Sequence, residues 1–157
     1  MPGISPFLWF DTQAEEAAEL YCSIFPNSRI LNTSRYAEGG PAPAGQVMTV
    51  TFELDGQRFT ALNGGPRFSF TEAVSFVVPC ETQAELDAIW DRLLEGGKAQ
   101  ACGWLKDRFG LSWQVVPAAL GRLMSDPDRA KSGRVMQAML KMVKFDIAVL
   151  EAAAKGT

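Results

Sequence analysis

The chain has 157 residues, 47% of them hydrophobic and 21% charged, a composition typical of a folded globular protein. Its 15 Lys and Arg against 18 Asp and Glu give a net charge of −3, which argues against a nucleic-acid binder. No apolar run approaches the roughly 18 residues of a membrane-spanning helix, and residues 1–6 lack the pattern of a signal peptide. We therefore expect a cytoplasmic protein that binds neither nucleic acid nor membrane.

The sequence contains no histidine. This excludes Ser-His-Asp and Cys-His nucleophile schemes and every metal site built on imidazole. Any catalysis would have to use carboxylates, Lys, Tyr, Cys or a bound cofactor.

The three cysteines, Cys22, Cys80 and Cys102, are odd in number and widely spaced, so neither a disulfide framework nor a CxxC motif is present. We expect buried or half-buried thiols in a reducing compartment. The alternative is a reactive thiol at Cys102, beside Lys106.

An internal repeat organises the chain. Residues 11–15 and 81–85 match closely, and each copy follows an apolar, strand-like run at 6–10 or 74–78. Each copy also opens a helical pattern, so the order of elements repeats as well as the short motif.

Each repeated motif contains a Thr-x-x-Glu capping box, in which a Thr hydroxyl and a Glu carboxylate satisfy free amides of the first helical turn. The pairs are Thr12 with Glu15 and Thr82 with Glu85. We expect the first helix to end at Pro26-Asn27 and the second at Gly96-Gly97.

Three strands are expected after each helix, which makes each half β-α-β-β-β. Asp55-Gly56 is typical of a tight hairpin turn. The expected strands are 29–36, 46–54 and 58–63 in the first half, and 98–102, 103–106 and 111–116 in the second.

Side-chain alternation assigns the faces of these strands. In residues 48–54 an apolar face should lie under a helix and a polar face should lie opposite it. The last strand alternates in the same way, with Trp113 and Val115 on the apolar face. The polar residues either line a pocket between two curved half-sheets or form a plain solvated face: Thr49, Thr51, Glu53, Ser112 and Gln114.

Residues 118–157 lie outside the repeat and have helical patterns. One helix should start at Asp126-Pro127 and a second at Asp146, where Phe145 and Leu150 can form a hydrophobic staple. An apolar stripe should lie in the core or in an oligomer contact rather than form an adaptable binding surface. It consists of Val135, Met136, Met139, Leu140 and Val143.

The expected fold is therefore α+β. It comprises two paired βαβββ modules over residues 1–117, divided into 1–66 and 67–117, and a helical C-terminal extension over 118–157.

Several stretches are similar to the PhnB-like group, often labelled 3-demethylubiquinone 3-methyltransferase domain. This group belongs to the vicinal oxygen chelate superfamily, with glyoxalase I, bleomycin-resistance proteins and extradiol dioxygenases. The resemblance implies curved mixed sheets and a homodimer, commonly with modules paired across chains. The stretches are 6–11, 15–17, 25–28, 62–66, 102–108, 110–117 and 136–140.

The superfamily's chemistry, which the resemblance implies, uses a metal held by His and Glu from four strands. Carried over, these ligands fall near Ile4 or Ser5, near Val74 or Ser75, near Thr60 or Leu62, and at Gln114. None of these residues is a standard ligand for a transition metal, so we expect neither a metal nor a cofactor.

The methyltransferase label implies a Gly-rich turn that opens a helix. The Gly-rich stretches, 38–45 and 63–66, instead have the pattern of strand connections. The second stretch joins the two modules and could act as a hinge for exchange between protomers.

Aromatic side chains on or beside the strands suggest a concave site for a small, partly aromatic molecule. Trp9 and Trp113 could equally be core residues, and residues 106–108 could be a solvated turn. The ligand-binding candidates are Trp9, Glu53, Asn63, Trp104, Lys106 and Gln114.

Three functions remain open. The first is metal-free binding of a small molecule. The second is an enzyme with a non-histidine site, such as a carboxylate metal site that includes Glu53. The third is a structural dimer with a vestigial pocket.

Overall fold

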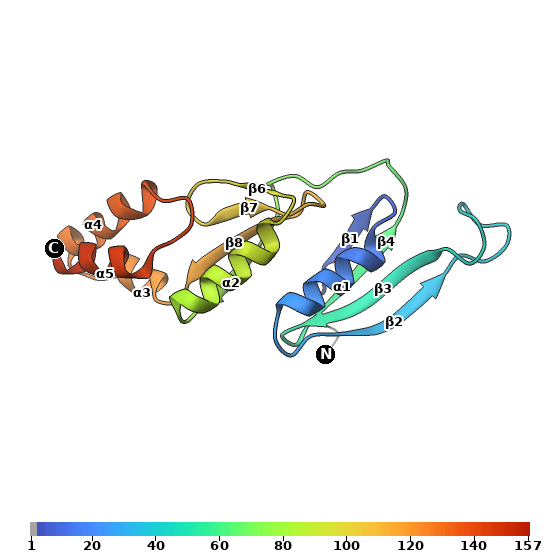
Figure 1. Cartoon of the computed structure of the whole chain (residues 1–157), viewed down its shortest axis with the longest axis horizontal. Coiled ribbons are helices and arrows are strands. Elements are labelled where there is room, and N and C mark those ends of the chain that lie inside the picture. The colour runs from blue at the N-terminus through green and yellow to red at the C-terminus, as the bar shows by residue number, and fades with distance from the viewer. Residues whose placement is uncertain (1–2) are drawn as a thin grey trace. The chain divides into compact units, whose positions relative to one another are not determined.

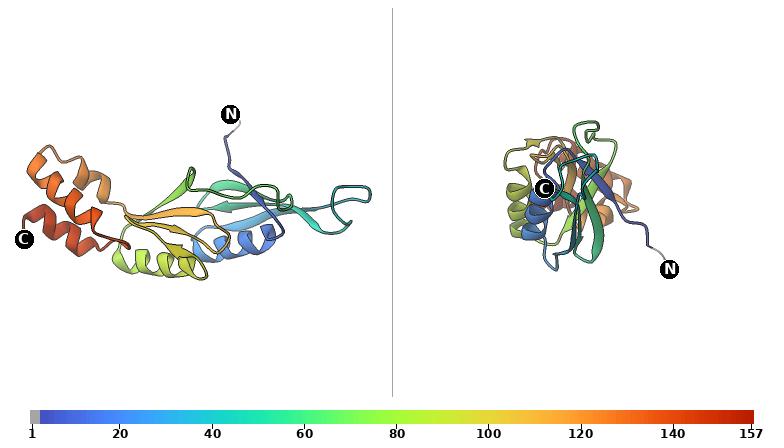
Figure 2. Two further views of the ribbon diagram at one scale, coloured as in Figure 1. Left: turned by 90° about the horizontal axis from the view of Figure 1, so that it is seen from above. Right: turned by 90° about the vertical axis from the view of Figure 1, so that its right-hand side faces the viewer.

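The computed structural model describes residues 3–157, so Met1 and Pro2 of the N-terminal stretch lie outside it. The chain forms two compact units, the first ending at Phe70 and the second running Thr71–Thr157. Each unit contains a four-stranded mixed sheet with a helix on one face (Figures 1 and 2). The expected α+β fold with two βαβββ modules is confirmed. The three-part division into 1–66, 67–117 and 118–157 stays a prediction.

The sheet of the first unit has the order β1-β4-β3-β2, in which β1 and β4 are parallel and the other pairs antiparallel. The elements are β1 Phe7–Phe10, α1 Ala14–Ile24, β2 Arg29–Arg35, β3 Val47–Leu54 and β4 Gln57–Asn63. The expected hairpin turn is confirmed, because Asp55 and Gly56 both have positive φ between paired Leu54 and Gln57. Because β1 and β4 are parallel, their carboxyl ends meet at the edge where α1 begins.

The core of the first unit lies between α1 and its sheet. Val50 and Phe52 on β3 are fully buried, and Tyr21 on α1 packs against the ring of Phe52. Thr49, Thr51 and Glu53 are only half-buried, as the alternation predicts.

The expected capping box of α1 is wrong. Gln13 occupies the N-cap position and makes no side-chain cap, and Thr12 accepts no amide of the first turn. Instead Asn63, at the end of β4, accepts the amide of Ala14 through Oδ1 at 2.8 Å. A side chain distant in sequence therefore replaces the local cap, and no local pattern could indicate it.

The second unit repeats the topology with the order β5-β8-β7-β6, in which β5 and β8 are parallel. Its elements are β5 Ser75–Cys80, α2 Gln83–Leu94, β6 Lys98–Ala99, β7 Trp104–Lys106 and β8 Ser112–Pro117. Here the Thr82 cap is confirmed, because its Oγ1 accepts the Glu85 amide at 3.1 Å. Glu85 also reaches back, but it accepts the amide of Glu81, one residue before the cap, rather than that of Thr82. The two thiols at Cys22 and Cys102 are half-buried and Cys80 is buried, as expected.

The turn between β7 and β8 is organised by a buried carboxylate. Asp107 is 3% exposed, and it accepts the amides of Phe109 and Leu111 and the indole N–H of Trp113. The interpretation of residues 106–108 as a fully solvated turn is therefore wrong for Asp107. Trp113, 2% exposed, is a core residue.

The second unit also contains three C-terminal helices, α3 Leu120–Met124, α4 Arg129–Leu140 and α5 Ile147–Lys155. Helix α3 has no counterpart in the expected pattern. Asp128 caps α4, so that helix starts two residues later than expected, and Asp126 accepts the Asp128 amide instead. Asp146 caps α5 as expected, and Phe145 and Leu150 are both buried.

The extension is anchored to the second module around Gln83. Its side chain donates to the Phe145 carbonyl and accepts the Ile147 amide, while Cys102 and Gly103 donate backbone amides to residues 142 and 143. The helices are thus part of the packed unit rather than a loose tail.

The C-terminal apolar stripe is only partly in the core. Val135 is fully buried, whereas Met136, Leu140 and Val143 are 38%, 55% and 51% exposed. The expectation of core packing is wrong for these three, and an oligomer contact stays a prediction. None of the helices in residues 3–157 is long and apolar enough to cross a membrane.

Candidate functional site

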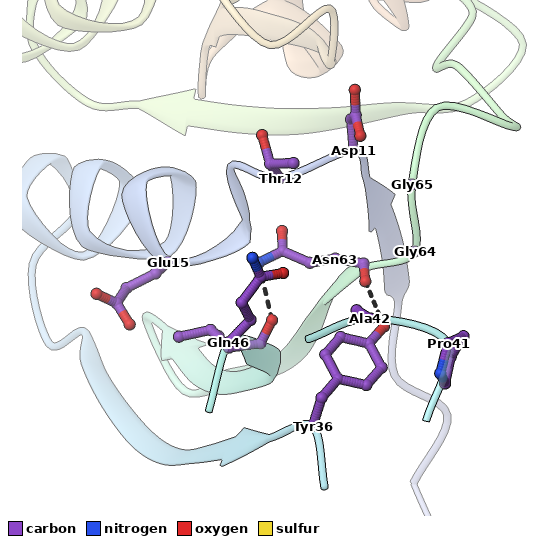
Figure 3. Close-up of a pocket in the computed structure, with 11 residues that line it drawn as sticks. Asp11, Thr12, Glu15, Tyr36, Pro41, Ala42, Gln46, Asn63, Gly64 and Gly65 are labelled. Atoms are coloured by element: carbon purple, nitrogen blue, oxygen red, sulfur yellow. Dashed lines mark hydrogen bonds between the residues drawn. The ribbon is translucent and has the colours of Figure 1, made fainter. Parts of the chain in front are cut away.

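A pocket of about 430 Å³ opens in the first unit where β1 and β4 end and α1 begins (Figure 3). This volume lies in the range of small-molecule sites, and the carboxyl ends of parallel strands are a common place for them. The pocket is lined by Asp11, Thr12, Glu15, Tyr36, Pro41, Ala42, Gln46, Val47, Asn63, Gly64 and Gly65.

Asn63 is the structural centre of this pocket. Besides capping α1, it donates Nδ2 to the Val47 carbonyl at 3.1 Å, so its amide links the helix to β3. Its backbone carbonyl accepts the Tyr36 hydroxyl at 2.5 Å. The two side-chain bonds fix the rotamer of Asn63, and the third holds the Tyr36 ring against its backbone.

Tyr36 forms an aromatic wall beside the loop that joins β2 to β3. Its backbone pairs with that loop, because its amide donates to Gln46 and its carbonyl accepts from Gly45. Gly45 has a φ of +90°, a conformation that side chains other than glycine rarely adopt. The loop thus holds Pro41 and Ala42 near the phenol ring (Figure 3).

The Gly64-Gly65 segment packs tightly against the indole of Trp9. A Cβ on Gly64 would lie 2.4 Å from the indole, and the indole N–H donates to the Gly65 carbonyl at 2.9 Å. Gly64 and Gly65 in turn donate to the carbonyls of Phe10 and Asp11. Glycine is required at position 64 for this close approach, whereas Gly65 has open space around it and a φ of +92°, which favours glycine.

Three polar side chains stand at the rim of the pocket. Within residues 3–157, the side chains of Asp11, Thr12 and Glu15 form no hydrogen bond or ion pair. Figure 3 shows Glu15 extending from the first turn of α1, while Asp11 and Thr12 point away from Tyr36. With two carboxylates at its rim, the pocket favours neutral or positively charged groups over anions.

The structure brings only one of the predicted ligand-binding residues, Asn63, into this pocket. Trp9 lies behind its glycine wall and also contacts Phe68 edge-to-face. Glu53, on β3, pairs with Arg29 at 3.4 Å. A ligand-binding role for Trp9 and Glu53 stays a prediction.

The other three predicted residues lie in the second unit. Lys106 pairs with Glu72 at 2.7 Å, and this contact lowers the pKa of the Glu72 carboxyl. Gln114 donates to Ser75 Oγ at 2.9 Å, and Trp104 is half-buried on β7. Their binding role likewise stays a prediction.

The other ten lining residues are not among the predicted binding residues, and they include Glu15, Tyr36 and Gln46. The sequence pattern places Glu15 in a capping box and Tyr36 at the end of a strand. It gives little sign of a binding wall at Tyr36, because Tyr36 is 27 residues from Asn63 in sequence and β3 lies between their strands.

The residues do not fit the metal that the superfamily resemblance implies. Gln114 and Ser75, at two of the expected ligand positions, hydrogen-bond to one another. In the described part of the chain no three Cys, Asp or Glu side chains lie close enough to hold a metal ion. We therefore derive no metal-dependent step.

Comparison with known proteins places the chain in a family. The family model described as 3-demethylubiquinone-9 3-methyltransferase matches residues 2–116. The PhnB protein of Bacillus cereus is 38% identical, with a TM-score of 0.68 over 73% of this chain and 99% of that protein.

More distant structures share the fold alone. Protein PA1353 of Pseudomonas aeruginosa is 21% identical, with a TM-score of 0.61 over 74% of this chain and 97% of its own. The fosfomycin resistance protein FosX of Mesorhizobium loti is 9% identical, with a TM-score of 0.53 over 75% of this chain and 92% of its own. No functionally curated protein matches the chain. The chain therefore belongs to the PhnB-like family described as 3-demethylubiquinone-9 3-methyltransferase.

Proposed function

We propose that the protein binds a small, partly aromatic, neutral or positively charged molecule in the pocket of the first module. One arrangement carries this proposal: the fixed ring of Tyr36 lines the same pocket as two rim carboxylates, Asp11 and Glu15, whose side chains have no partner within residues 3–157. An aromatic ring can pack on Tyr36 while a polar group reaches Glu15 or Gln46. A ligand carboxylate would meet two like charges and bind more weakly.

Three small compounds that share one aromatic ring but differ in charge test the proposal. Benzylamine, benzyl alcohol and benzoate are titrated by calorimetry at low ionic strength. We expect benzylamine to bind most tightly and benzoate at least about tenfold more weakly, since like charges at an interface are unfavourable. Absence of binding for all three at millimolar concentration contradicts the proposal, as does tighter binding of benzoate.

Matched variants assign the site. Glu15→Gln should remove the preference for benzylamine over benzyl alcohol, and Tyr36→Ala should weaken both. Glu19→Gln is the control, because Glu19 is an exposed carboxylate on the same helix outside the pocket. An equal effect of the Glu19 and Glu15 variants would indicate general electrostatics rather than a site.

The family description names a methyltransferase, so the Gly-rich stretches of this chain can be compared with the Gly-rich turn of such enzymes. A Rossmann-like methyltransferase places a Gly-rich turn between a strand and a helix. Here residues 38–45 join β2 to β3 and residues 63–66 lie between β4 and β5, so neither begins a helix. These residues favour binding over that kind of transfer.

A cytoplasmic location is part of the same proposal. It is supported by three free thiols, which are common in reducing compartments. Cell fractionation tests it, and recovery of the protein from an extracytoplasmic fraction would contradict it.

A further inference from the structure

Charge is unevenly distributed along the chain. Residues 118–157 hold seven Lys or Arg and four Asp or Glu, whereas residues 1–117 hold eight and fourteen. The C-terminal helices are therefore basic on an acidic protein. They also lie outside the region that the family model matches, which ends at residue 116.

Three of these seven cations line a groove between α4 and α5. These helices lie side by side (Figure 2), and the groove has a volume of about 640 Å³. Arg129, Arg134 and Lys141 line it, and its small lining residues include Ala130 and Gly133. Small residues on a helix face allow a second helix to approach closely.

The three cations differ in how they are held. Arg134 donates Nε and Nη2 to the carbonyls of Ala153 and Ala154, which fixes its guanidinium at the end of α5. Within residues 3–157, Arg129 and Lys141 form no ion pair. Two groove cations are therefore available to an anionic partner.

The same chain carries a surface of the opposite charge on α2. Its buried stripe is Leu86, Ile89, Trp90 and Leu93, and the opposite face is exposed. That exposed face presents Ala84 and Ala88, with Glu81 at one end and Asp91, Arg92 and Glu95 at the other, so its carboxylates outnumber its one cation. Among the described residues, the side chains of Asp91 and Glu95 have no hydrogen-bond or ion-pair partner.

We propose that the α4–α5 groove binds the exposed face of α2 from a second copy of this chain. Two features support this occupant. The charges are complementary, with cations along the groove and carboxylates along α2, and both faces have small residues where two helices would approach. This surface is distinct from the module pairing that the family resemblance implies, because its groove is formed by α4 and α5, which lie beyond the matched region, although α2 lies within it.

Two charge-reversal variants test this contact. The first is Arg129→Glu with Lys141→Glu, which makes the groove acidic, and the second is Asp91→Lys with Glu95→Lys, which makes α2 basic. Association is measured by fluorescence titration at 20 mM and 500 mM NaCl, with circular dichroism to verify folding. The wild type should self-associate at low salt, and its affinity should fall at least about tenfold at high salt, since exposed charges are screened. The affinity of self-association of each variant alone should fall by a similar factor, while a mixture of the two variants should associate with restored affinity.

The control for net charge is Arg35→Glu with Arg58→Glu, which reverses two exposed cations outside the groove. This control should not gain affinity for the variant with the basic α2. Equal gain by the control overturns the proposal, because it would reflect net charge alone. A wild type that stays monomeric at low salt, or a dimer that neither variant weakens, overturns it as well.

Discussion

Asn63 and Ala14 are joined by a hydrogen bond of 2.8 Å that links the end of β4 to the first turn of α1. The same side chain donates to Val47, and the same residue's carbonyl accepts from Tyr36. Helix capping and pocket geometry therefore depend on one residue.

Asn63→Ala should lower the free energy of unfolding by about 1–3 kcal/mol, because it removes a helix cap and leaves the Val47 carbonyl without this donor. Urea unfolding measures the loss. Asn32→Ala, an exposed asparagine on β2, is the control and should change stability by less than about 0.5 kcal/mol. Similar losses for the two variants would show that the Asn63 contacts are not structural.

Gly103→Ala should destabilise the second unit by about 2–4 kcal/mol, because a Cβ there would lie 2.4 Å from the Phe145 ring at a φ of +80°. Gly110→Ala separates the steric clash from the cost of the positive φ. Gly110 has a φ of +89° and open space around it, so only the backbone cost of about 1–2 kcal/mol applies. Thermal unfolding compares the two, and equal losses would exclude a role for the Phe145 contact.

Ser112→Ala should raise the free energy of unfolding by about 1 kcal/mol. Ser112 is fully buried, and among the described residues its hydroxyl is the buried side-chain group without a hydrogen-bond partner. Ser75→Ala is the contrasting variant, because it removes the acceptor of Gln114 and should destabilise. A loss of stability in Ser112→Ala would reveal an unrecognised partner.

The pair between Lys106 and Glu72 should make stability depend on acid pH. Lys106 lowers the pKa of Glu72 from its ordinary value of 4.5, so the pair stabilises the fold above that value. Its contribution is lost as the pH falls through the lowered pKa. Glu72→Gln should therefore be less stable than the wild type at pH 7 and equal to it near pH 2.

Urea unfolding at both pH values checks this prediction. Glu38→Gln, which alters an exposed carboxylate in the loop between β2 and β3, is the control. A Glu72→Gln deficit that persists unchanged at the lowest pH would contradict the electrostatic cause.

Burial should make the Cys80 thiol the least reactive of the three. Its pKa is raised to about 11, first by desolvation and then by the charge of Glu85. Alkylation with iodoacetamide at pH 8 should therefore label Cys102 before Cys80, as peptide mass spectrometry can show. Faster labelling of Cys80 would indicate that the second unit opens readily.

Most of the fold could be predicted from the sequence, because the sequence patterns that indicate it are local and repeated. Alternation along β3, the Asp55-Gly56 turn and the Thr82 cap each appear in the structure. Parallel pairing of β1 with β4 and the Asn63 cap join distant residues, and no local pattern encodes such contacts.

Most of the candidate pocket could not be predicted from the sequence. Asn63 is a predicted binding residue because of its amide, but Tyr36 and Gln46 meet it only through the pairing of β2, β3 and β4. Tryptophan is a residue type typical of binding sites. In this structure, however, the indole N–H of Trp113 donates to Asp107 and that of Trp9 donates to the Gly65 carbonyl.

The most direct test of ligand binding at this pocket is a ¹⁵N chemical-shift titration of the whole protein with benzylamine. Binding as proposed should shift the amides of Ala14, Gly64 and Gly65 in a saturable manner, and Glu15→Gln should weaken that response. Saturable shifts confined to β7 and β8, or none up to millimolar benzylamine, would contradict a binding site at the start of α1.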